Sequence, residues 1–230
     1  MPASHGLQNT AFVCGMENEA NCLRAAGIDN PIALSGARSQ RAAEISRELI
    51  ACGAQSLISI GLAGGLDPRL GPGSVILADR VLSRSSQFET DPELRAQLSA
   101  ALGDETRQGA IVGVDRVVAT RGEKQRLYGE TKGLACDMES HALAEAALAA
   151  GVPFLVLRVV SDASNRFIPQ SALAAITASG RTSPGRVLFS LSLRPWEVFE
   201  LLALARDARI AFAALRRVAL RGAPLFSTTR

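Results

Sequence analysis

The chain has 230 residues, enough for a single domain with a sizeable hydrophobic core. Hydrophobic residues make up 47% of it but aromatic residues only 4%, so Ala, Leu and Val must fill that core. A formal net charge of only +3, together with the lack of a nucleic-acid-binding motif, argues against a nucleic-acid-binding protein.

The cysteines and histidines give no pattern of a metal site or a disulfide framework. The four cysteines form no CxxC pair and lie in apolar segments, as is typical of reduced cysteines in a cytosolic protein: Cys14, Cys22, Cys52 and Cys136. His5 and His141 lack ligand spacing, so we expect no metal. The N-terminus has no signal pattern, and no apolar run reaches the ~18 residues of a spanning helix. We therefore expect a cytoplasmic protein.

Short apolar runs alternate with longer helical patterns along the chain. The apolar runs predict strands at 10–16, 31–36, 56–61, 74–83, 109–114, 135–138 and 153–161. Helical periodicity followed by glycine predicts helices at 17–27, 38–53 and 139–151. This alternation predicts an α/β domain, in which helices cover both faces of a mostly parallel sheet.

Acidic residues follow three of the predicted strands. Glu17 and Glu19 follow the first, Asp137 and Glu139 follow the short strand, and Asp162 follows the last. Ligands of such sheets bind at the carboxyl ends of the strands. A ring of carboxylates without basic partners there predicts acid–base chemistry on an uncharged or cationic centre. Structural alternatives remain open: Glu139 can favour a helix dipole, Asp162 can be the N-cap of the next segment, and at most one of Glu17 and Glu19 is expected to face the site.

The glycine-rich stretch GLAGGL (61–66) does not predict a dinucleotide-binding loop. Its spacing is not GxGxxG, and two prolines follow where a helix should begin. We interpret it as a tight turn, either a purely structural one or one where the backbone approaches a ligand or another strand. His141 is given no role.

The run ACDMESHALAEAALAAGVPFLVLRVVSDASN (135–165) resembles the purine nucleoside phosphorylase and methylthioadenosine/S-adenosylhomocysteine nucleosidase superfamily. DMES and RVVSD, separated by a helix and a strand, are its signature. GMENEA (15–20) and SIGLAGGLDPRLGPGSVILAD (59–79) match the nucleosidase branch in order and spacing. The resemblance covers roughly residues 10–180. It implies one three-layer α/β/α domain (1–230) around a twisted mixed sheet, assembled as a homodimer or larger oligomer.

The resemblance also implies cleavage of the N-glycosidic bond of an adenine nucleoside. Asp162 takes the place of the general acid that protonates the purine ring at N7, and Ser161 would orient it. Glu139 takes the place of the carboxylate that grips the ribose hydroxyls, and Met138 would pack on the sugar. Glu19 matches the residue that polarises the attacking water.

Further substrate contacts are expected on both sides of the base. Val118 falls where backbone atoms meet the adenine edge, and Val117 falls where the family often has an aromatic ring. Leu62 and Gly64 of the glycine-rich stretch are also candidates for binding the substrate.

The sequence departs from the phosphorylases at the phosphate site. Those enzymes hold phosphate with an Arg and a Ser, but here the two positions are Ser59 and Leu62. Phosphate would lose two partners worth ~1–3 kcal/mol each, and Glu19 would repel it. We therefore expect water as the nucleophile and no cofactor. Phosphorolysis with phosphate held by Arg38 is the alternative, as is a methylthioadenosine/S-adenosylhomocysteine nucleosidase. The rival from another class, a non-catalytic nucleoside sensor, is disfavoured because all three acids are present.

Residues 181–230 lie mostly outside the resemblance and predict a C-terminal helical extension. The pattern predicts a helix over 194–222 that starts near Pro195, ends at Gly222 and carries Trp196 near its start. Apolar residues at helical spacing together with several arginines allow two interpretations. The helix either packs on the core, or it is a basic amphipathic helix that contacts a membrane or a lipid-like substrate.

This tail, together with GLAGGLDPRLGPG, resembles the hopanoid-associated phosphorylase/nucleosidase group. That resemblance implies adenosylhopane as the substrate and adenine as a product. The interpretation of 194–222 as a basic amphipathic helix adds the expectation of peripheral contact with the inner membrane.

Overall fold

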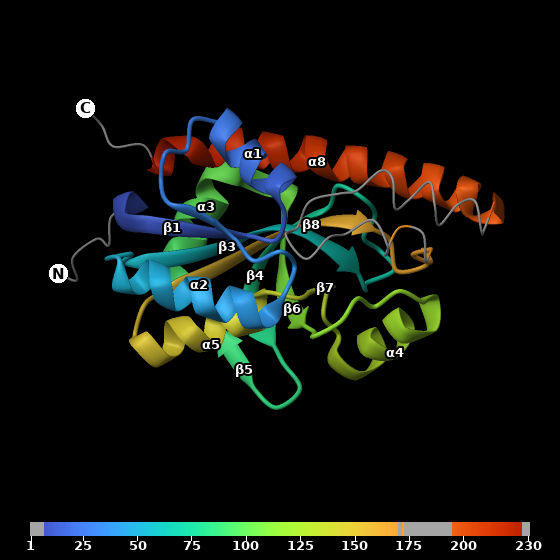
Figure 1. The fold of residues 1–230 in the computed structure, drawn as a ribbon, viewed down its shortest axis with the longest axis horizontal. Helices are drawn as coiled ribbons and strands as arrows, with labels where there is room; N and C mark the ends of the chain where they lie inside the picture. The colour runs from blue at the N-terminus through green and yellow to red at the C-terminus, as the bar shows by residue number, and fades with distance from the viewer. Residues whose placement is uncertain (1–6, 170–171, 173–194, 227–230) are drawn as a thin grey trace.

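The computed structural model describes residues 7–169, 172 and 195–226. The sheet lies in the middle, with α1, α3 and α8 over one face and α2 and α5 over the other (Figure 1). This arrangement confirms the expected α/β class. It also leaves the carboxyl ends of several strands close to α4, where the candidate site lies.

Eight strands make up the sheet within the described residues: β1 (Thr10–Cys14), β2 (Ile32–Leu34), β3 (Ser56–Gly65), β4 (Val75–Leu82), β5 (Gln87–Glu89), β6 (Thr106–Gly113), β7 (Ala135–Asp137) and β8 (Phe154–Asp162). Their order is β2-β1-β3-β7-β6-β4-β5, and β8 pairs with both β3 and β4. The β3–β7, β4–β5 and β4–β8 pairs are antiparallel, whereas the other pairs are parallel. The mixed sheet implied by the resemblance is therefore present.

The helices are α1 (Glu17–Ala25), α2 (Ser39–Ala51), α3 (Pro92–Leu102), α4 (Arg121–Thr131), α5 (Ser140–Ala150) and α8 (Val198–Phe226), with 3-10 turns at Leu7–Asn9, Gly103–Glu105 and Pro195–Glu197. The elements α3, α4 and β5 were not predicted from the sequence. The signal for α3 was present, because Asp91 caps it, Pro92 opens it and three leucines at every fourth position face the core. No apolar stripe marks α4, whose buried residue is Lys124.

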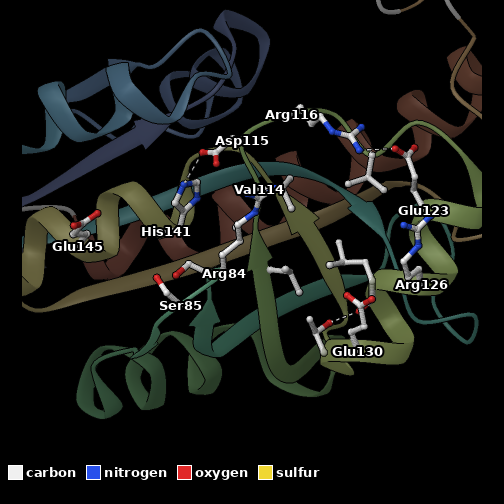
Figure 2. A pocket seen from close by; sticks show the side chains of 16 residues that line it. Arg84, Ser85, Val114, Asp115, Arg116, Glu123, Arg126, Glu130, His141 and Glu145 are labelled. Carbon is white, nitrogen blue, oxygen red and sulfur yellow. Dashed lines mark hydrogen bonds and ion pairs between the residues drawn. The ribbon is translucent and has the colours of Figure 1, made fainter.

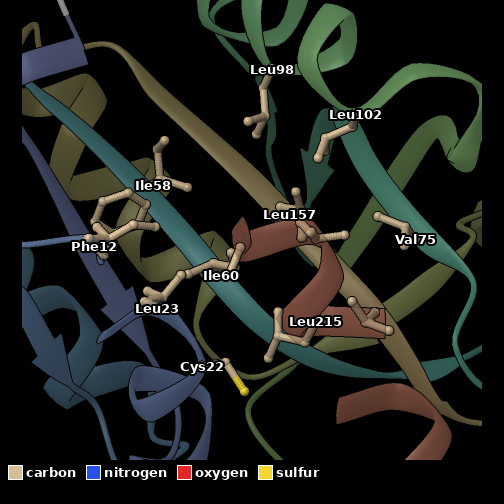
Figure 3. Packing of buried hydrophobic residues seen from close by; sticks show 14 of the residues in the cluster. Phe12, Cys22, Leu23, Ile58, Ile60, Val75, Leu98, Leu102, Leu157 and Leu215 are labelled. Carbon is tan, nitrogen blue, oxygen red and sulfur yellow. The ribbon is translucent and has the colours of Figure 1, made fainter. Parts of the chain in front are cut away.

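Aliphatic side chains fill the core, as the composition predicts. Figure 3 shows Phe12, Leu23, Ile58 and Leu157 converging beneath α8, which contributes Leu215. A second cluster lies on the opposite face of the sheet, where α2 and α5 cover it. Both faces of the central strands are therefore buried, so a charged residue within them needs a partner.

The glycine-rich stretch is not a tight turn. Most of it lies in β3, which continues to Gly65. A Cβ atom at Gly61 would lie 2.7 Å from Oε1 of Glu19, and one at Gly65 would lie 3.0 Å from the backbone oxygen of Asp162. The expected close approach to another strand is thus confirmed, but the reason for glycine is space beside β8 and α1 rather than a turn conformation.

The two halves of α8 have different surroundings. The second half is buried against the sheet, and Phe226 at its end packs edge-to-face on Phe12 with ring centroids 4.9 Å apart. This packing carries the helix past Gly222 and Pro224, so the expected end at Gly222 is wrong. The first turns extend beyond the sheet and expose Phe199, whose exposed fraction is 78% (Figure 1).

The expectation that this helix packs on the core therefore holds for its second half. Within the part of the chain that is described, no helix combines the length and the apolar character that crossing a bilayer requires.

Candidate active site

Strand ends and loops from distant parts of the chain surround one cavity of about 180 Å³. Nearly all the candidate residues line it: Glu19, Leu62, Gly64, Val117, Val118, Met138, Glu139, Ser161 and Asp162. Arg38, the candidate for phosphate, is exposed at the start of α2 and is not among the described residues that line the cavity.

Glu19 reaches the cavity from the first turn of α1. Its Oε2 accepts a hydrogen bond from the backbone N–H of Met16 (2.8 Å), and its Oε1 accepts one from that of Leu62 (2.8 Å). The side chain is buried, and burial raises the pKa of its carboxyl above the ordinary value, against the opposing effect of these N–H groups. Glu17 pairs instead with Arg24 (2.8 Å), and its side chain is 42% exposed. As expected, only one of the two faces the site.

A buried arginine occupies the middle of β8 and joins the acids of the site. Arg158 contacts the carboxylate of Asp137, and its Nη2 donates to Oγ of Ser59 (2.6 Å) and to Oε2 of Glu139 (3.4 Å). Burial opposes the charge of Arg158, but the carboxylates of Asp137, Glu139 and Glu19 outweigh it and raise its pKa. The expectation of carboxylates without basic partners is therefore wrong.

The sequence did contain a signal for Arg158. It is the charged residue inside LVLRVV, a strand that is apolar on both faces. Such a residue must have a buried partner, because an isolated charge is too costly to bury.

Glu139 and Glu19 converge on the same point above Gly15. A Cβ atom at Gly15 would lie 2.6 Å from Oε1 of Glu139 and 3.3 Å from Oε2 of Glu19. Burial raises the pKa of Glu139 to about 8, and the nearby charges of Asp137 and Glu19 add to the rise while that of Arg158 opposes it. Two carboxyls that lie this close disfavour each other's charged form.

Asp137, rather than Glu139, caps α5. Oδ1 of Asp137 accepts hydrogen bonds from the backbone N–H (3.0 Å) and the Oγ (2.7 Å) of Ser140. Glu139 occupies the N-cap position, but its side chain makes no capping hydrogen bond. It points instead to Ser35, whose Oγ donates to Oε1 (3.4 Å), and to Arg158. Helix capping therefore does not account for the Glu139 carboxyl.

At the other end of the cavity, Asp162 closes β8 with a buried carboxylate. Ser161 Oγ donates to its Oδ1 (2.6 Å), as the expected orienting contact requires. Lys124 Nζ contacts Oδ2 and also donates to the backbone oxygen of Ala163 (3.0 Å). Residues 163–169 contain no helix, so Asp162 does not serve as an N-cap. Lys124 was missed because nothing in the polar sequence of α4 marks it as buried.

A larger hollow of about 700 Å³ lies beside this cavity and shares Val114 and Val118 with it. Figure 2 shows its charged rim, with Arg116 paired to Glu123 (2.7 Å) and Nε2 of His141 near Oδ1 of Asp115 (3.3 Å). We place the chemistry in the smaller cavity, because the acids at the strand ends line that one. No group of three His, Cys, Asp or Glu side chains that could hold a metal occurs in the described part of the chain.

Solved structures of other proteins share this fold. Futalosine hydrolase of Helicobacter pylori superposes with a TM-score of 0.65 at 22% identity, covering 83% of this chain and 100% of that one. The 5'-methylthioadenosine/S-adenosylhomocysteine nucleosidase of Neisseria meningitidis, in complex with methylthio-immucillin-A, gives a TM-score of 0.66 at 21% identity, covering 92% and 97%. At these identities the likeness concerns the fold.

Sequence relatives point to the same superfamily. A 5'-methylthioadenosine/S-adenosylhomocysteine nucleosidase of Mycobacterium bovis is 27% identical over 182 residues, which is 57% of this chain and 71% of the relative. One of Marinomonas sp. is 31% identical over 143 residues, 50% of this chain and 59% of the relative. A family model described as "Phosphorylase superfamily" matches residues 25–182, more than half of the chain. The chain therefore belongs to the phosphorylase superfamily, as the motifs around DMES and RVVSD indicate.

Proposed function

We propose that the protein hydrolyses the N-glycosidic bond of an adenine nucleoside and releases adenine. The observation that carries this proposal is the convergence of Glu19, Glu139 and Asp162 on one small cavity from three separate elements. The nucleosidase names of the relatives in Mycobacterium bovis and Marinomonas support the same bond type.

At the sugar end, buried carboxyls stabilise positive charge. Breaking the bond from ribose to purine gives the sugar the character of an oxocarbenium ion, which a fixed carboxylate nearby stabilises. Glu139 holds the ribose hydroxyls and Met138 packs on the ring. Glu19 holds the attacking water, and its raised pKa suits a general base that must take a proton near neutral pH.

At the base end, Asp162 donates a proton to N7 of the purine. The departing base would otherwise leave as an anion, and a positioned acid typically contributes ~10²–10⁴-fold to such a step. The hydrogen bond from Ser161 fixes the carboxyl orientation. Val117 and Val118 form the apolar wall beside the base.

Water is favoured over phosphate because the groups that could hold phosphate are engaged. The hydroxyl of Ser59 accepts from Arg158, and the backbone N–H of Leu62 donates to Glu19. Arg38 is exposed and outside the described lining of the cavity. A phosphate ion would have to displace the Glu19 carboxyl from its N–H donors.

The test is to incubate the protein with adenosine and with methylthioadenosine, with and without phosphate, and to identify the products by mass spectrometry. Adenine and free sugar formed without phosphate support the proposal. Strict phosphate dependence with a sugar 1-phosphate product would establish phosphorolysis and direct attention to Arg38. Tight binding without any adenine release would establish a nucleoside sensor.

We further propose that the natural substrate is lipid-linked, adenosylhopane in the narrowest form, and that the first turns of α8 contact the membrane that holds it. Phe199 and Leu202 in these turns, and Trp196 in the 3-10 turn just before them, are exposed and lie outside the packed half of the helix. Exposed aromatic and aliphatic side chains beside arginines suit an interface between water and lipid.

Replacing Trp196 and Phe199 by Ser should weaken binding to anionic vesicles and slow cleavage of a long-chain adenosyl substrate. Cleavage of adenosine should not change, because the packed half of α8 is untouched. Leu148→Ser, at another exposed hydrophobic position, is the control. Unchanged vesicle binding would contradict the membrane contact. The homodimer implied by the resemblance is also a proposal, which light scattering of the 24.2 kDa chain tests directly.

A further inference from the structure

Lys124 is a buried lysine on a helix that is otherwise at the surface. The chain has two lysines, Lys124 and Lys132. The side chain of Lys124 is 0% exposed, although it lies in the first turns of α4, whose other residues are exposed or half-buried. Lys132 is exposed at the end of the same helix and lies 5.3 Å above the ring of Tyr128. The burial of one lysine therefore needs a specific explanation.

The ammonium of Lys124 is directed at the candidate general acid. It contacts Oδ2 of Asp162 and donates to the backbone oxygen of Ala163 (3.0 Å). On β7, Cys136 lies beside the pair, but burial and then the charge of Asp162 raise the pKa of its thiol to about 12, so it stays protonated. Glu123 on α4 pairs with Arg116 instead. Asp162 is thus the acid that the Lys124 ammonium contacts.

Stability alone gives no reason to place an ammonium here. A buried ion pair often contributes no more than apolar side chains of similar size would, because two charges must be desolvated. Apolar side chains in place of both Lys124 and Asp162 would attach α4 to the body of the protein without that desolvation cost. The ammonium is therefore explained by the Asp162 carboxylate beside it rather than by the packing of α4.

The cation at the sugar end provides the contrast. There Arg158 joins Asp137 and Glu139, and a guanidinium does not release its proton in proteins. An ammonium can release one. We infer that Lys124 supplies, through Asp162, the proton that the purine takes up when the glycosidic bond breaks. Lys124 is not among the described residues that line the cavity, so it acts as a positioning and proton-supplying residue behind Asp162. The inference rests on the proposed function.

The protons balance over one turnover. The bond from C1′ to N9 breaks and its electron pair goes to the purine. The proton passes from Nζ to the Asp162 carboxylate and from that carboxyl to N7, which leaves a neutral amine. Water adds to C1′ and gives its proton to Glu19. After adenine leaves, Glu19 releases that proton to solvent and Lys124 takes one up. Nucleoside and water thus give adenine and free sugar without a net proton change.

Two substrates whose leaving groups differ in their need for a proton test whether Lys124 supplies that proton. Adenosine needs a proton on its leaving group, whereas 4-nitrophenyl β-D-ribofuranoside loses a stable phenolate that needs none. In the wild-type protein, kcat for adenosine should fall at alkaline pH beyond any fall that it shares with the nitrophenyl riboside through the titration of Glu139 near pH 8. In Lys124→Met, kcat for adenosine at pH 8 should fall at least ~10²-fold with KM little changed, and the alkaline limb should move to lower pH. The nitrophenyl riboside should be cleaved normally.

Two further variants keep the inference testable if Lys124→Met folds poorly. Lys124→Arg keeps the positive charge but cannot give up a proton, so it should lose adenosine cleavage as Lys124→Met does. Lys132→Met, which removes the other lysine of the chain, should change neither substrate. The wild-type pH profiles require no variant at all.

The outcomes distinguish the inference from the function on which it rests. Normal adenosine cleavage by Lys124→Met or Lys124→Arg, or equal losses on both substrates, would overturn the role of Lys124 while leaving the nucleosidase intact. The same holds if both wild-type profiles show the same alkaline limb. A wild-type protein that releases adenine from no nucleoside would overturn the proposed function and the proton supply together.

Discussion

At the sugar end of the cavity Asp137 and Glu139 share the guanidinium of Arg158, whereas at the base end Asp162 is paired with the ammonium of Lys124. Both cations are fully buried and both hold carboxylates at strand ends. They differ in whether they can exchange a proton. Two equally buried ion pairs beside one cavity therefore differ in the chemistry that their cations allow. The sugar end holds a cation that keeps its proton, whereas under the proposed mechanism the cation of the base end gives one up.

The largest loss of activity is expected from replacing Glu19, the residue proposed to hold the attacking water. Glu19→Gln keeps the shape of the side chain but removes the base that accepts the proton from water. We expect no detectable release of adenine in an absorbance or mass-spectrometric assay, with unchanged melting temperature. Glu17→Gln, two residues away and paired with Arg24 at the surface, is the matched control and should retain activity. Substantial turnover by Glu19→Gln would show that another group activates the water.

Replacing Arg158 should lower the free energy of unfolding more than replacing Lys124. Arg158→Met leaves Asp137 and Glu139 buried without their shared partner, and breaking such a pair typically costs ~3–5 kcal/mol. Lys124→Met leaves a single carboxylate, so its cost should be smaller. Urea unfolding followed by circular dichroism measures both. Equal free energies of unfolding for the two variants would mean that Arg158 and Lys124 contribute equally to stability.

Asp162→Asn tests the base end on catalysis alone. The amide keeps the size of the side chain and can still accept a hydrogen bond from Ser161, so substrate should still bind. Loss of the acid should lower kcat for an adenine nucleoside by at least ~10²-fold, the low end for a general acid. Calorimetry of inhibitor binding and steady-state kinetics separate the two effects, with the exposed Asp29→Asn as control. Near-normal turnover would remove Asp162 from the mechanism.

The smallest expected effect is on stability, which should depend on pH because Glu139 titrates. The pKa of Glu139 is raised to about 8 in the folded protein, above the value of 4.5 for an unperturbed Glu side chain. The folded state therefore binds more protons than the unfolded state between these pH values. The resulting stability is fully present below about pH 4.5 and is lost as the pH rises through about 8.

Glu139→Gln should flatten this decline. Melting temperatures measured from pH 5 to 9 should fall less in the variant than in the wild-type protein, by several degrees, since ~1 kcal/mol shifts Tm by ~2–4 °C in a chain of this size. Parallel curves for the two proteins would mean that Glu139 titrates normally. Glu145→Gln, on the same helix but outside the cavity, should follow the wild-type curve.

The strands and helices that could be predicted from the sequence are those with one or both faces buried, because burial sets the spacing of their apolar residues. The core strands and the helices α1, α2 and α5 were all located, because their apolar residues repeat with the period of the element. The ends were less certain where tertiary contacts decide them. The strand β3 runs on through the glycines because it lies against β8, and α8 continues past Pro224 because Phe226 is buried.

The site was predictable to the extent that strand ends and family motifs determine it. The acids Glu19, Glu139 and Asp162 were identified, but both of their cations were overlooked. Arg158 could have been found from its place in an apolar strand. Lys124 could not, because a lysine in a charged helix normally faces water, and only the three-dimensional path of α4 brings it to Asp162.

The glycines at positions 15 and 61 allow a test that uses only the sequences of related proteins. In this chain a Cβ atom at Gly61 would lie 2.7 Å from Oε1 of Glu19, and one at Gly15 would lie 2.6 Å from Oε1 of Glu139 and 3.3 Å from Oε2 of Glu19. A genome-encoded relative with alanine or a larger residue in place of Gly61 would have to move that acid away from the backbone donor at Leu62. The glycine pair can thus serve as a filter when related sequences are sorted. Chains that keep both glycines retain room for Glu19 and Glu139, and under the proposed mechanism those that lose Gly61 must activate their nucleophile in another way.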